Sequence, residues 1–247
     1  MNSQRLTEIL NKVAPFDISC EWDNYGAVLD CGLDFERALF ALDASDETIA
    51  RAKKLGCGAV VSHHPAIFGQ GLKKLSSTDA VVQAAMNRIS LFNVHTCWDA
   101  AEGGVNDVLC DRLGVTDVKK FDLGRMGLLS ADSAKELAEH VKKSINAGNV
   151  SYVEGKSPIK TVAVVGGAGG DYIAEAKQAG CDALITGEVK HHEMLLARQI
   201  GLNVVCAGHF ATEVVSIEAL RRAVQREAGN ELECILFEDE RDPEKTL

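Results

Sequence analysis

Short apolar runs alternate with segments of helical periodicity along most of the chain, and this alternation constrains the fold more than any other feature. The runs have strand length, and they lie at 37–43, 58–62, 89–95, 150–155, 160–166, 182–187, 203–208 and 233–239. The segments between them repeat their apolar residues at helical spacing, at 45–56, 78–88, 104–114, 133–146, 171–180, 190–200 and 213–229. Such βα alternation predicts an α/β fold with mostly parallel sheets covered by helices.

Part of this pattern occurs twice. Residues 49–61 align with 173–185 at an offset of 124 positions, and seven of the thirteen positions are identical. Any two βα units look broadly alike, because a helix, a glycine cap and an apolar strand recur in all of them. The Gly-Cys pair that both segments share favours an internal duplication instead.

A second match follows in each half. The stretch from His95 to Asp99 aligns with the stretch from His209 to Glu213 at an offset of 114, and both have the form His-x-x-x-carboxylate. We therefore predict two similar βα-repeat halves related by a pseudo-twofold axis. The division falls at 1–125 and 126–247, and the two halves are expected to form one compact unit with the functional site between them.

The composition excludes several classes of protein. A formal net charge of −10 disfavours non-specific binding to nucleic acid or to anionic membranes. The chain has no apolar run near the ~20 residues that span a bilayer, and its first residues lack the apolar core of a signal peptide. Its eight cysteines include no CxxC pair, which is typical of free thiols in a reducing cytoplasm. We expect a cytoplasmic location.

Two adjacent histidines, His63 and His64, end the apolar run Ala59–Ser62 and precede Pro65. Neighbouring side chains inside a strand point to opposite faces, so two histidines could share a site only at the end of a strand. Pro65 keeps His64 in an extended conformation. Functional residues of α/β sheets lie at these carboxyl ends of the strands.

Imidazole and carboxylate groups at predicted strand ends make a candidate metal site. The set consists of His63, His64, Asp99, His209 and Glu213. These ligand types suit zinc, iron, manganese or nickel. One hydrolytic metal needs only three protein ligands, so five such groups, two of them carboxylates, suit two metals about 3.5–4 Å apart.

Each element also has a simpler interpretation. A His-His pair is more often a surface or capping feature, and His-x-x-x-Glu is more often an ordinary i,i+4 contact on a helix. His191 and His192 also follow a strand, but their spacing suits an exposed helix start, and they are second-choice ligands. The glycine-rich stretch 164–171 lacks a GxGxxG motif, and we interpret it as a tight turn with close backbone approach; a phosphate contact there is the alternative.

At these residues the sequence resembles the YbgI-like family of GTP cyclohydrolase 1 type 2 homologues. The resemblance covers nearly the whole chain, in order. It is carried by Glu21-Trp22-Asp23-Asn24-Tyr25-Gly26, the SHHP at 62–65, His95-x-x-x-Asp99, Thr186-Gly187-Glu188 and Gly208-His209 through Glu213. The family usually has Asn-Leu or a similar pair before the aspartate, whereas this chain has Cys97-Trp98 before Asp99. The difference leaves the candidate ligand Asp99 in place and is expected to alter the wall of the pocket.

The resemblance implies a duplicated α/β fold with a dinuclear site on His63, His64, Asp99, His209 and Glu213. It also implies a toroidal homohexamer with its sites facing an inner cavity, and hydrolytic opening of the guanine imidazole ring. His95 is then a candidate general acid/base or an orienting residue, and the alternative is that it only anchors the strand end.

Two function hypotheses follow. The first is a hydrolase that uses two divalent metals and acts on a nucleotide or a similar small polar substrate. The second is a metal-binding scaffold or interaction protein without turnover. Catalysis requires an open coordination position, whereas a structural site is closed. No GxSxG motif or cysteine nucleophile motif is present, so covalent catalysis has no candidate.

Overall fold

The computed structural model describes residues 1–68, 74–156 and 158–245, and it has the expected alternation of strands and helices. Among these residues, no helix has both the length and the apolar character needed to cross a membrane. The chain divides into two compact units. Unit 1 is Met1–Gly104 with Ile217–Arg241, and unit 2 is Val105–Ser216 with the residues from Asp242 onward.

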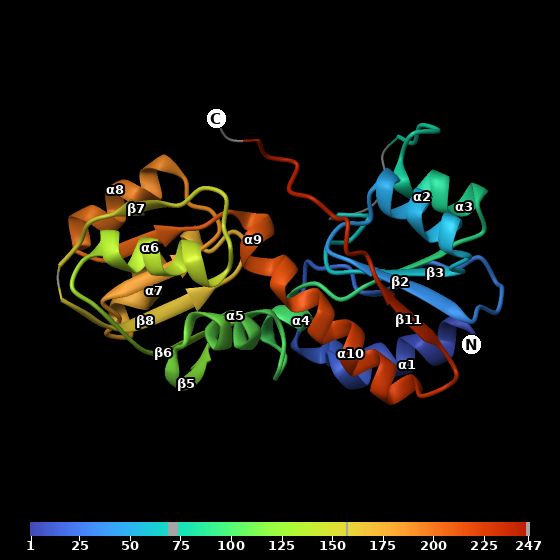
Figure 1. Cartoon of the computed structure of the whole chain (residues 1–247), viewed down its shortest axis with the longest axis horizontal. Coiled ribbons are helices and arrows are strands. Elements are labelled where there is room, and N and C mark those ends of the chain that lie inside the picture. Colours follow the sequence, from blue (N-terminus) through green and yellow to red (C-terminus); the bar gives the residue numbers. More distant parts are fainter. Residues whose placement is uncertain (69–73, 157, 246–247) are drawn as a thin grey trace. The chain divides into compact units, whose positions relative to one another are not determined.

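Unit 1 contains one five-stranded sheet with the order β1-β4-β3-β2-β11. Its elements are α1 (Ser3–Val13), η1 (Phe16–Ile18), β1 (Gly26–Leu29), β2 (Arg37–Ala41), α2 (Asp46–Leu55), β3 (Ala59–Ser62), α3 (Ala80–Met86), β4 (Ser90–Asn93), α4 (Thr96–Ala100), α10 (Ile217–Ala228) and β11 (Glu233–Leu236). The strands β4, β3, β2 and β11 run parallel, and β1 joins β4 antiparallel at the edge. Helices α2 and α3 lie over one face of this sheet, and α1 and α10 lie over the other (Figure 1).

Local signals in the sequence set the helix ends. Helix α2 begins after Ser45, whose hydroxyl accepts a hydrogen bond from the amide of Thr48 over 3.1 Å. It ends at Gly56, which has the left-handed conformation with φ of +69°. Serine before a helix and glycine after it are common caps, so both ends of α2 follow from neighbouring residues.

Unit 2 contains a six-stranded sheet with the order β5-β6-β8-β9-β10-β7. Its elements are α5 (Val105–Leu113), β5 (Thr116–Phe121), β6 (Gly124–Ala131), α6 (Ala134–Ser144), β7 (Ser151–Val153), β8 (Ile159–Val165), η2 (Gly170–Tyr172), α7 (Ile173–Gln178), β9 (Ala183–Thr186), α8 (His191–Ile200), β10 (Asn203–Cys206), α9 (His209–Glu213) and η3 (Val214–Ser216). The strands β8, β9 and β10 are parallel, whereas β5, β6 and β7 pair antiparallel.

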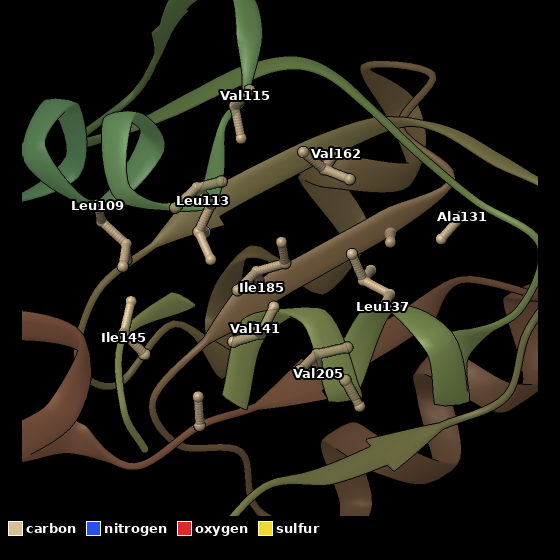
Figure 2. Packing of buried hydrophobic residues seen from close by; sticks show 14 of the residues in the cluster. Leu109, Leu113, Val115, Ala131, Leu137, Val141, Ile145, Val162, Ile185 and Val205 are labelled. Atoms are coloured by element: carbon tan, nitrogen blue, oxygen red, sulfur yellow. The ribbon is translucent and has the colours of Figure 1, made fainter. Parts of the chain in front are cut away.

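Both faces of the central strands in unit 2 are buried, and this explains their continuous apolar runs. Along β8, Val162 and Val164 pack into one core together with Leu137 and Ile185, as Figure 2 shows in part. The alternate residues of β8 pack into a second core that includes Ile173 of α7. Because successive side chains point to opposite faces, a strand covered by helices on both sides needs apolar residues at every position.

The two units repeat the same substructure, and this confirms the α/β fold class with repeated halves. Three consecutive parallel strands, β2-β3-β4 in unit 1 and β8-β9-β10 in unit 2, form the centre of each sheet. The glycines at the ends of the repeated helices, Gly56 and Gly180, both have positive φ. The cysteines that follow them, Cys57 and Cys181, are both buried.

Several details differ from the expectation. The division between units falls after Gly104 rather than at residue 125, and β11 pairs with β2 in the sheet of unit 1. Strands β1, β5 and β6 were not expected; β5 has mostly exposed side chains and therefore lacks an apolar pattern. The expected helix 213–229 is interrupted by η3, so α9 ends at Glu213 and α10 begins at Ile217.

Candidate metal centre

The paired histidines lie just beyond the carboxyl end of β3. The backbone continues its pairing with the chain after β2: the amide of His63 donates to the carbonyl of Ala41 over 3.2 Å, and that of His64 to Leu42 over 2.9 Å. His63 is fully buried, and its Nδ1 lies 3.0 Å from the carbonyl oxygen of Val94. The two ring centroids are 5.0 Å apart. The end of the strand thus brings both imidazoles to one place, as the sequence predicted.

His64 has a different partner. Its Nδ1 lies 2.8 Å from Oδ1 of Asp43, a residue that follows β2. Asp43 is in turn held by the C-terminal segment, because the carboxylate of Glu240 accepts hydrogen bonds from the amides of Leu42 and Asp43 over 2.7 and 2.8 Å. Burial raises the pKa of Glu240, while these two backbone hydrogen bonds oppose the rise.

His95 lies at the N-cap of the short helix α4, where β4 leads into that helix. Its Nδ1 lies 2.9 Å from Oδ1 of Asp23, and Asp23 also accepts from the amide and hydroxyl of Thr96 over 2.9 and 2.6 Å. Burial alone would raise the pKa of Asp23, but the hydrogen bonds from His95 and Thr96 outweigh it and lower this pKa to about 2. Asp23 is therefore an ionised, buried acceptor.

Three imidazoles and one carboxylate gather in unit 1. One ring nitrogen from each of His63, His64 and His95 lies within 4.8 Å of the others, so these three residues could hold a metal ion. Asp99 of α4 adds a carboxylate whose Oδ1 lies 3.7 Å from Nε2 of His63. His95 therefore lies directly beside His63 and His64, two of the expected metal ligands.

Unit 2 contributes one imidazole and one carboxylate from helix α9. Nε2 of His209 lies 3.1 Å from Oε2 of Glu213, one helical turn away. Nδ1 of His209 lies 3.1 Å from Oε1 of Glu188, which follows β9. The i,i+4 contact expected as the simpler alternative is therefore present, and it presents both side chains on the same face of α9.

The four histidines share one feature that favours metal binding. In each ring Nδ1 faces an oxygen acceptor: a backbone carbonyl for His63 and a carboxylate for His64, His95 and His209. A carbonyl or carboxylate oxygen only accepts, so at His63, His64 and His95 the ring proton is assigned to Nδ1 and the lone pair to Nε2. At His209 both ring nitrogens lie 3.1 Å from a carboxylate oxygen, Nδ1 from Glu188 and Nε2 from Glu213, so these contacts do not distinguish the two nitrogens. Metal-binding histidines typically have such an acceptor behind them.

The glycine-rich loop after β8 makes room for the carboxylate of Glu213. Gly167 has φ of +65°, and a Cβ atom built on it would lie 2.1 Å from Oε1 of Glu213. The loop is thus a tight turn with close backbone approach, as predicted. The alternative of a phosphate contact is not favoured, because the amides of Gly166, Gly167 and Gly169 already donate to Asn106, Thr212 and Thr186.

The remaining candidates fall outside these clusters. His191 and His192 are the first residues of α8, and both are exposed, as expected for a helix start. Cys97 and Trp98 are both buried in unit 1. Burial raises the pKa of the Cys97 thiol to about 11.

Sequence reasoning missed the residues that orient the histidines. Asp23 and Glu188 stand in motifs that the sequence analysis quoted without giving them a role. Asp43 and Glu240 carried no signal at all, because only the folded chain brings Asp43 to His64 and Glu240 to the amides of Leu42 and Asp43.

The donor chemistry fits a divalent metal ion. Neutral imidazole nitrogens and carboxylate oxygens are the ligands that zinc, iron, manganese and nickel accept. Buried or half-buried groups of this kind could hold a metal ion here. The hydrogen-bonded acceptors behind the rings and the glycine turn beside Glu213 support the same conclusion.

Comparisons with known proteins identify relatives of this chain. The family model described as Duf34/NIF3 (NGG1p interacting factor 3) matches residues 1–243. A Clostridium perfringens protein named GTP cyclohydrolase 1 type 2 homolog is 28% identical over 98% of this chain and 98% of its own length. A Methanocaldococcus jannaschii protein of the same name is 30% identical over 90% of this chain and 93% of its own.

Solved structures show the same fold. The protein ybgI, described as of unknown function, covers 99% of this chain and 100% of its own with 26% identity and a TM-score of 0.89. Reduced HcgD from Methanocaldococcus jannaschii covers 96% of this chain and 98% of its own with 28% identity and a TM-score of 0.82.

Proposed function

Since the chain belongs to the Duf34/NIF3 family, we propose that it is a hydrolase that uses two divalent metal ions and acts on a nucleotide or a similar small polar substrate. The observation that carries the proposal is the gathering of imidazoles and carboxylates that could hold a metal ion, in which Nδ1 of each of four histidines faces an oxygen acceptor. The relatives named GTP cyclohydrolase 1 type 2 homolog support the choice of reaction class.

The proposed ligands come from both units of the chain. His63, His64 and Asp99 would serve from unit 1, and His209 and Glu213 from unit 2. Two carboxylates and three imidazoles suit two ions better than one, because three protein ligands are enough for a single hydrolytic metal. Zinc, iron, manganese and nickel all accept this set.

A bound divalent ion supplies a water molecule whose pKa falls from 15.7 to about 7 and a positive charge that polarises the substrate. The protein supplies the positioning. Asp23 fixes the ring of His95 through Nδ1, so that Nε2 of His95 is available to move a proton to or from the substrate. His95 is therefore our candidate general acid/base, and its position beside His63 and His64 also allows it to act as an additional ligand.

Two further proposals concern the setting of this activity. All eight cysteines are free, which supports a reducing compartment such as the cytoplasm. We also propose a toroidal homohexamer, following the family resemblance. Light scattering on the purified protein checks this, because a hexamer has six times the 26.5 kDa mass of the chain.

The test begins with metal analysis of the purified protein and calorimetric titration of chelator-treated protein with Zn²⁺ and Mn²⁺. We expect two ions per chain, and a loss of binding in both His64→Ala and Glu213→Ala. The matched control is the double variant His191→Ala/His192→Ala, which removes an exposed His-His pair. Full binding in the Glu213→Ala variant would contradict a ligand set shared by the two units.

The second step is a screen of nucleotides and phosphoesters with and without chelator. We expect hydrolysis that depends on the metal and is lost in His64→Ala and Glu213→Ala. A metal-loaded protein that is inactive on every compound would instead favour the non-catalytic scaffold. Activity that survives both substitutions would remove the hydrolase proposal.

A further inference from the structure

Two large aromatic side chains lie exposed beside the histidine cluster of unit 1. Trp22 is 56% exposed and Phe68 is 67% exposed. Their ring centroids are 5.9 Å apart, and each ring also lies close to His95, at 5.9 Å for Trp22 and 6.0 Å for Phe68. An apolar surface of two rings therefore borders an imidazole of the candidate centre.

Hydrogen bonds fix the segment that carries Trp22, so the exposed indole has a defined position. The next residue, Asp23, binds His95 and Thr96, and the amide of Cys20 donates to the hydroxyl of Thr96 over 2.9 Å. One anchor is the side-chain carboxylate of Asp23, the residue after Trp22, and the other is the backbone amide of Cys20, two residues before it. The ring is thus presented from a fixed base.

The same segment also fixes the backbone next to Phe68. The side-chain amide of Asn24 donates to the carbonyl of Ile67 over 3.2 Å. The buried side chain of Asn93, at the end of β4, donates in turn to the carbonyl of Asn24. One hydrogen-bonded chain of residues therefore ties the bases of both aromatic rings to the strand that leads to His95.

The size and setting of this surface favour a small planar ligand. A stable protein interface buries about 800 Å² on each partner, which is more than two side chains provide. A planar ring can stack on an indole or phenyl face, and such stacking depends little on which base is bound because every base has a π-face. The polar part of the same ligand would then reach the imidazoles next to the rings.

We propose that Trp22 and Phe68 form a stacking surface for a planar heteroaromatic ring, and that this surface selects ring-bearing substrates for the neighbouring centre. The inference rests on the proposed function for the reaction, but the stacking itself involves only residues of unit 1. It predicts that a nucleoside phosphate binds better than the same sugar phosphate without a base.

The experiment measures binding rather than turnover. Guanosine and adenosine monophosphates are compared with ribose 5-phosphate by equilibrium dialysis, with metal-loaded and with chelator-treated protein. We expect both nucleotides to bind at least tenfold more tightly than ribose 5-phosphate, and within a few-fold of each other. The nucleotides should also quench tryptophan fluorescence. The chain has two tryptophans, and Trp98 is only 2% exposed, so Trp22 gives the signal.

Substitutions test whether the preference for nucleotides comes from the rings of Trp22 and Phe68. Trp22→Ala and Phe68→Ala should each weaken nucleotide binding about tenfold and leave ribose 5-phosphate unaffected, while Trp22→Phe should retain part of the affinity. The matched control is Tyr152→Ala, which removes an aromatic ring that is 42% exposed on β7 of unit 2. Circular dichroism confirms that each variant is folded.

The outcomes separate this inference from the proposed function. Preference for ring-bearing ligands that disappears in Trp22→Ala supports the stacking surface, even in protein that binds no metal. Equal binding of ribose 5-phosphate and the nucleotides by metal-loaded protein overturns the stacking surface and leaves the metal centre standing. A Trp22→Ala variant with unchanged nucleotide binding and an altered oligomeric state also overturns it, and assigns the rings to contacts between copies of the chain.

Discussion

Asp43 Oδ1 lies 2.8 Å from Nδ1 of His64, so the carboxylate fixes both the orientation of the imidazole and the position of its proton. The same arrangement recurs at His95 with Asp23 and at His209 with Glu188. In each of these three contacts, the carboxylate comes from another segment of the same unit as the histidine.

Removal of the acceptor behind His64 should weaken metal binding. Asp43→Ala leaves Nδ1 without its carboxylate, so the ring loses its fixed orientation and part of its basicity. We expect metal affinity to fall about 10- to 100-fold, measured by calorimetric titration with Zn²⁺ or Mn²⁺. The control is Asp46→Ala, which removes an exposed carboxylate from the first turn of α2. Equal affinities of the two variants would show that Asp43 does not act on the metal through His64.

A methyl group at Gly167 should displace Glu213. The Cβ atom of Gly167→Ala would lie 2.1 Å from Oε1 of Glu213, and Gly167 also has φ of +65°. Gly180→Ala is the matched control, since Gly180 has φ of +82° and no atom within 4 Å of its Cβ position. Both substitutions should cost about 1–2 kcal/mol through the left-handed backbone, seen as a lower Tm. Only Gly167→Ala should also reduce metal content, and equal metal content in the two variants would contradict the role of this turn.

Asp23 should make stability depend on pH in the acid range. Its pKa falls from 3.8 to about 2 in the folded protein, below the unfolded value. Its contribution is therefore fully present above pH 3.8 and is lost as the pH falls from 3.8 toward 2. The shift corresponds to about 2 kcal/mol.

The measurement is urea unfolding of wild type and Asp23→Asn, compared at a series of pH values. The difference in the free energy of unfolding between the two proteins should be largest near pH 6 and should shrink as the pH falls below 3.8. A difference that stays constant from pH 6 to pH 3 would exclude this contribution from Asp23.

The cysteines should divide into two classes of reactivity. Burial raises the pKa to about 11 or 12 for six thiols, those of Cys57, Cys97, Cys110, Cys181, Cys206 and Cys234. Cys20 and Cys31 are half-buried. Titration of the native protein with a thiol reagent at pH 8 should therefore detect about two fast groups, and all eight should react in urea. More than two fast thiols in the native protein would contradict the buried positions.

Much of the local structure could be predicted from the sequence. The caps of α2 and the apolar runs of β3 and β9 depend on neighbouring residues, and the structure has them where the patterns place them. Strand β5 was missed because its side chains are mostly exposed, so it has no apolar face to identify it. The place of β11 was missed because pairing with β2 joins residues nearly 200 positions apart, and no local pattern records such a partner.

The candidate site also combines features that neighbouring residues determine with features that depend on distant parts of the chain. His63 and His64 are recognisable from the sequence, because a strand end followed by proline is a local feature. His95 was expected at this site, but its ring contacts with both histidines depend on how β3 and β4 lie side by side in the sheet. The exposed pair of Trp22 and Phe68 likewise needs two distant segments to meet.

The sequence by itself determined most of the strands and helices and the kinds of ligand that follow them, because periodicity, capping and residue chemistry act over a few neighbouring positions. The tertiary structure decided which oxygen acceptor faces Nδ1 of each histidine, because these acceptors come from other segments of the chain. Those hydrogen bonds join residues such as Asp23 and His95, which lie 72 positions apart. Only the packing of the folded chain brings such groups within reach of each other.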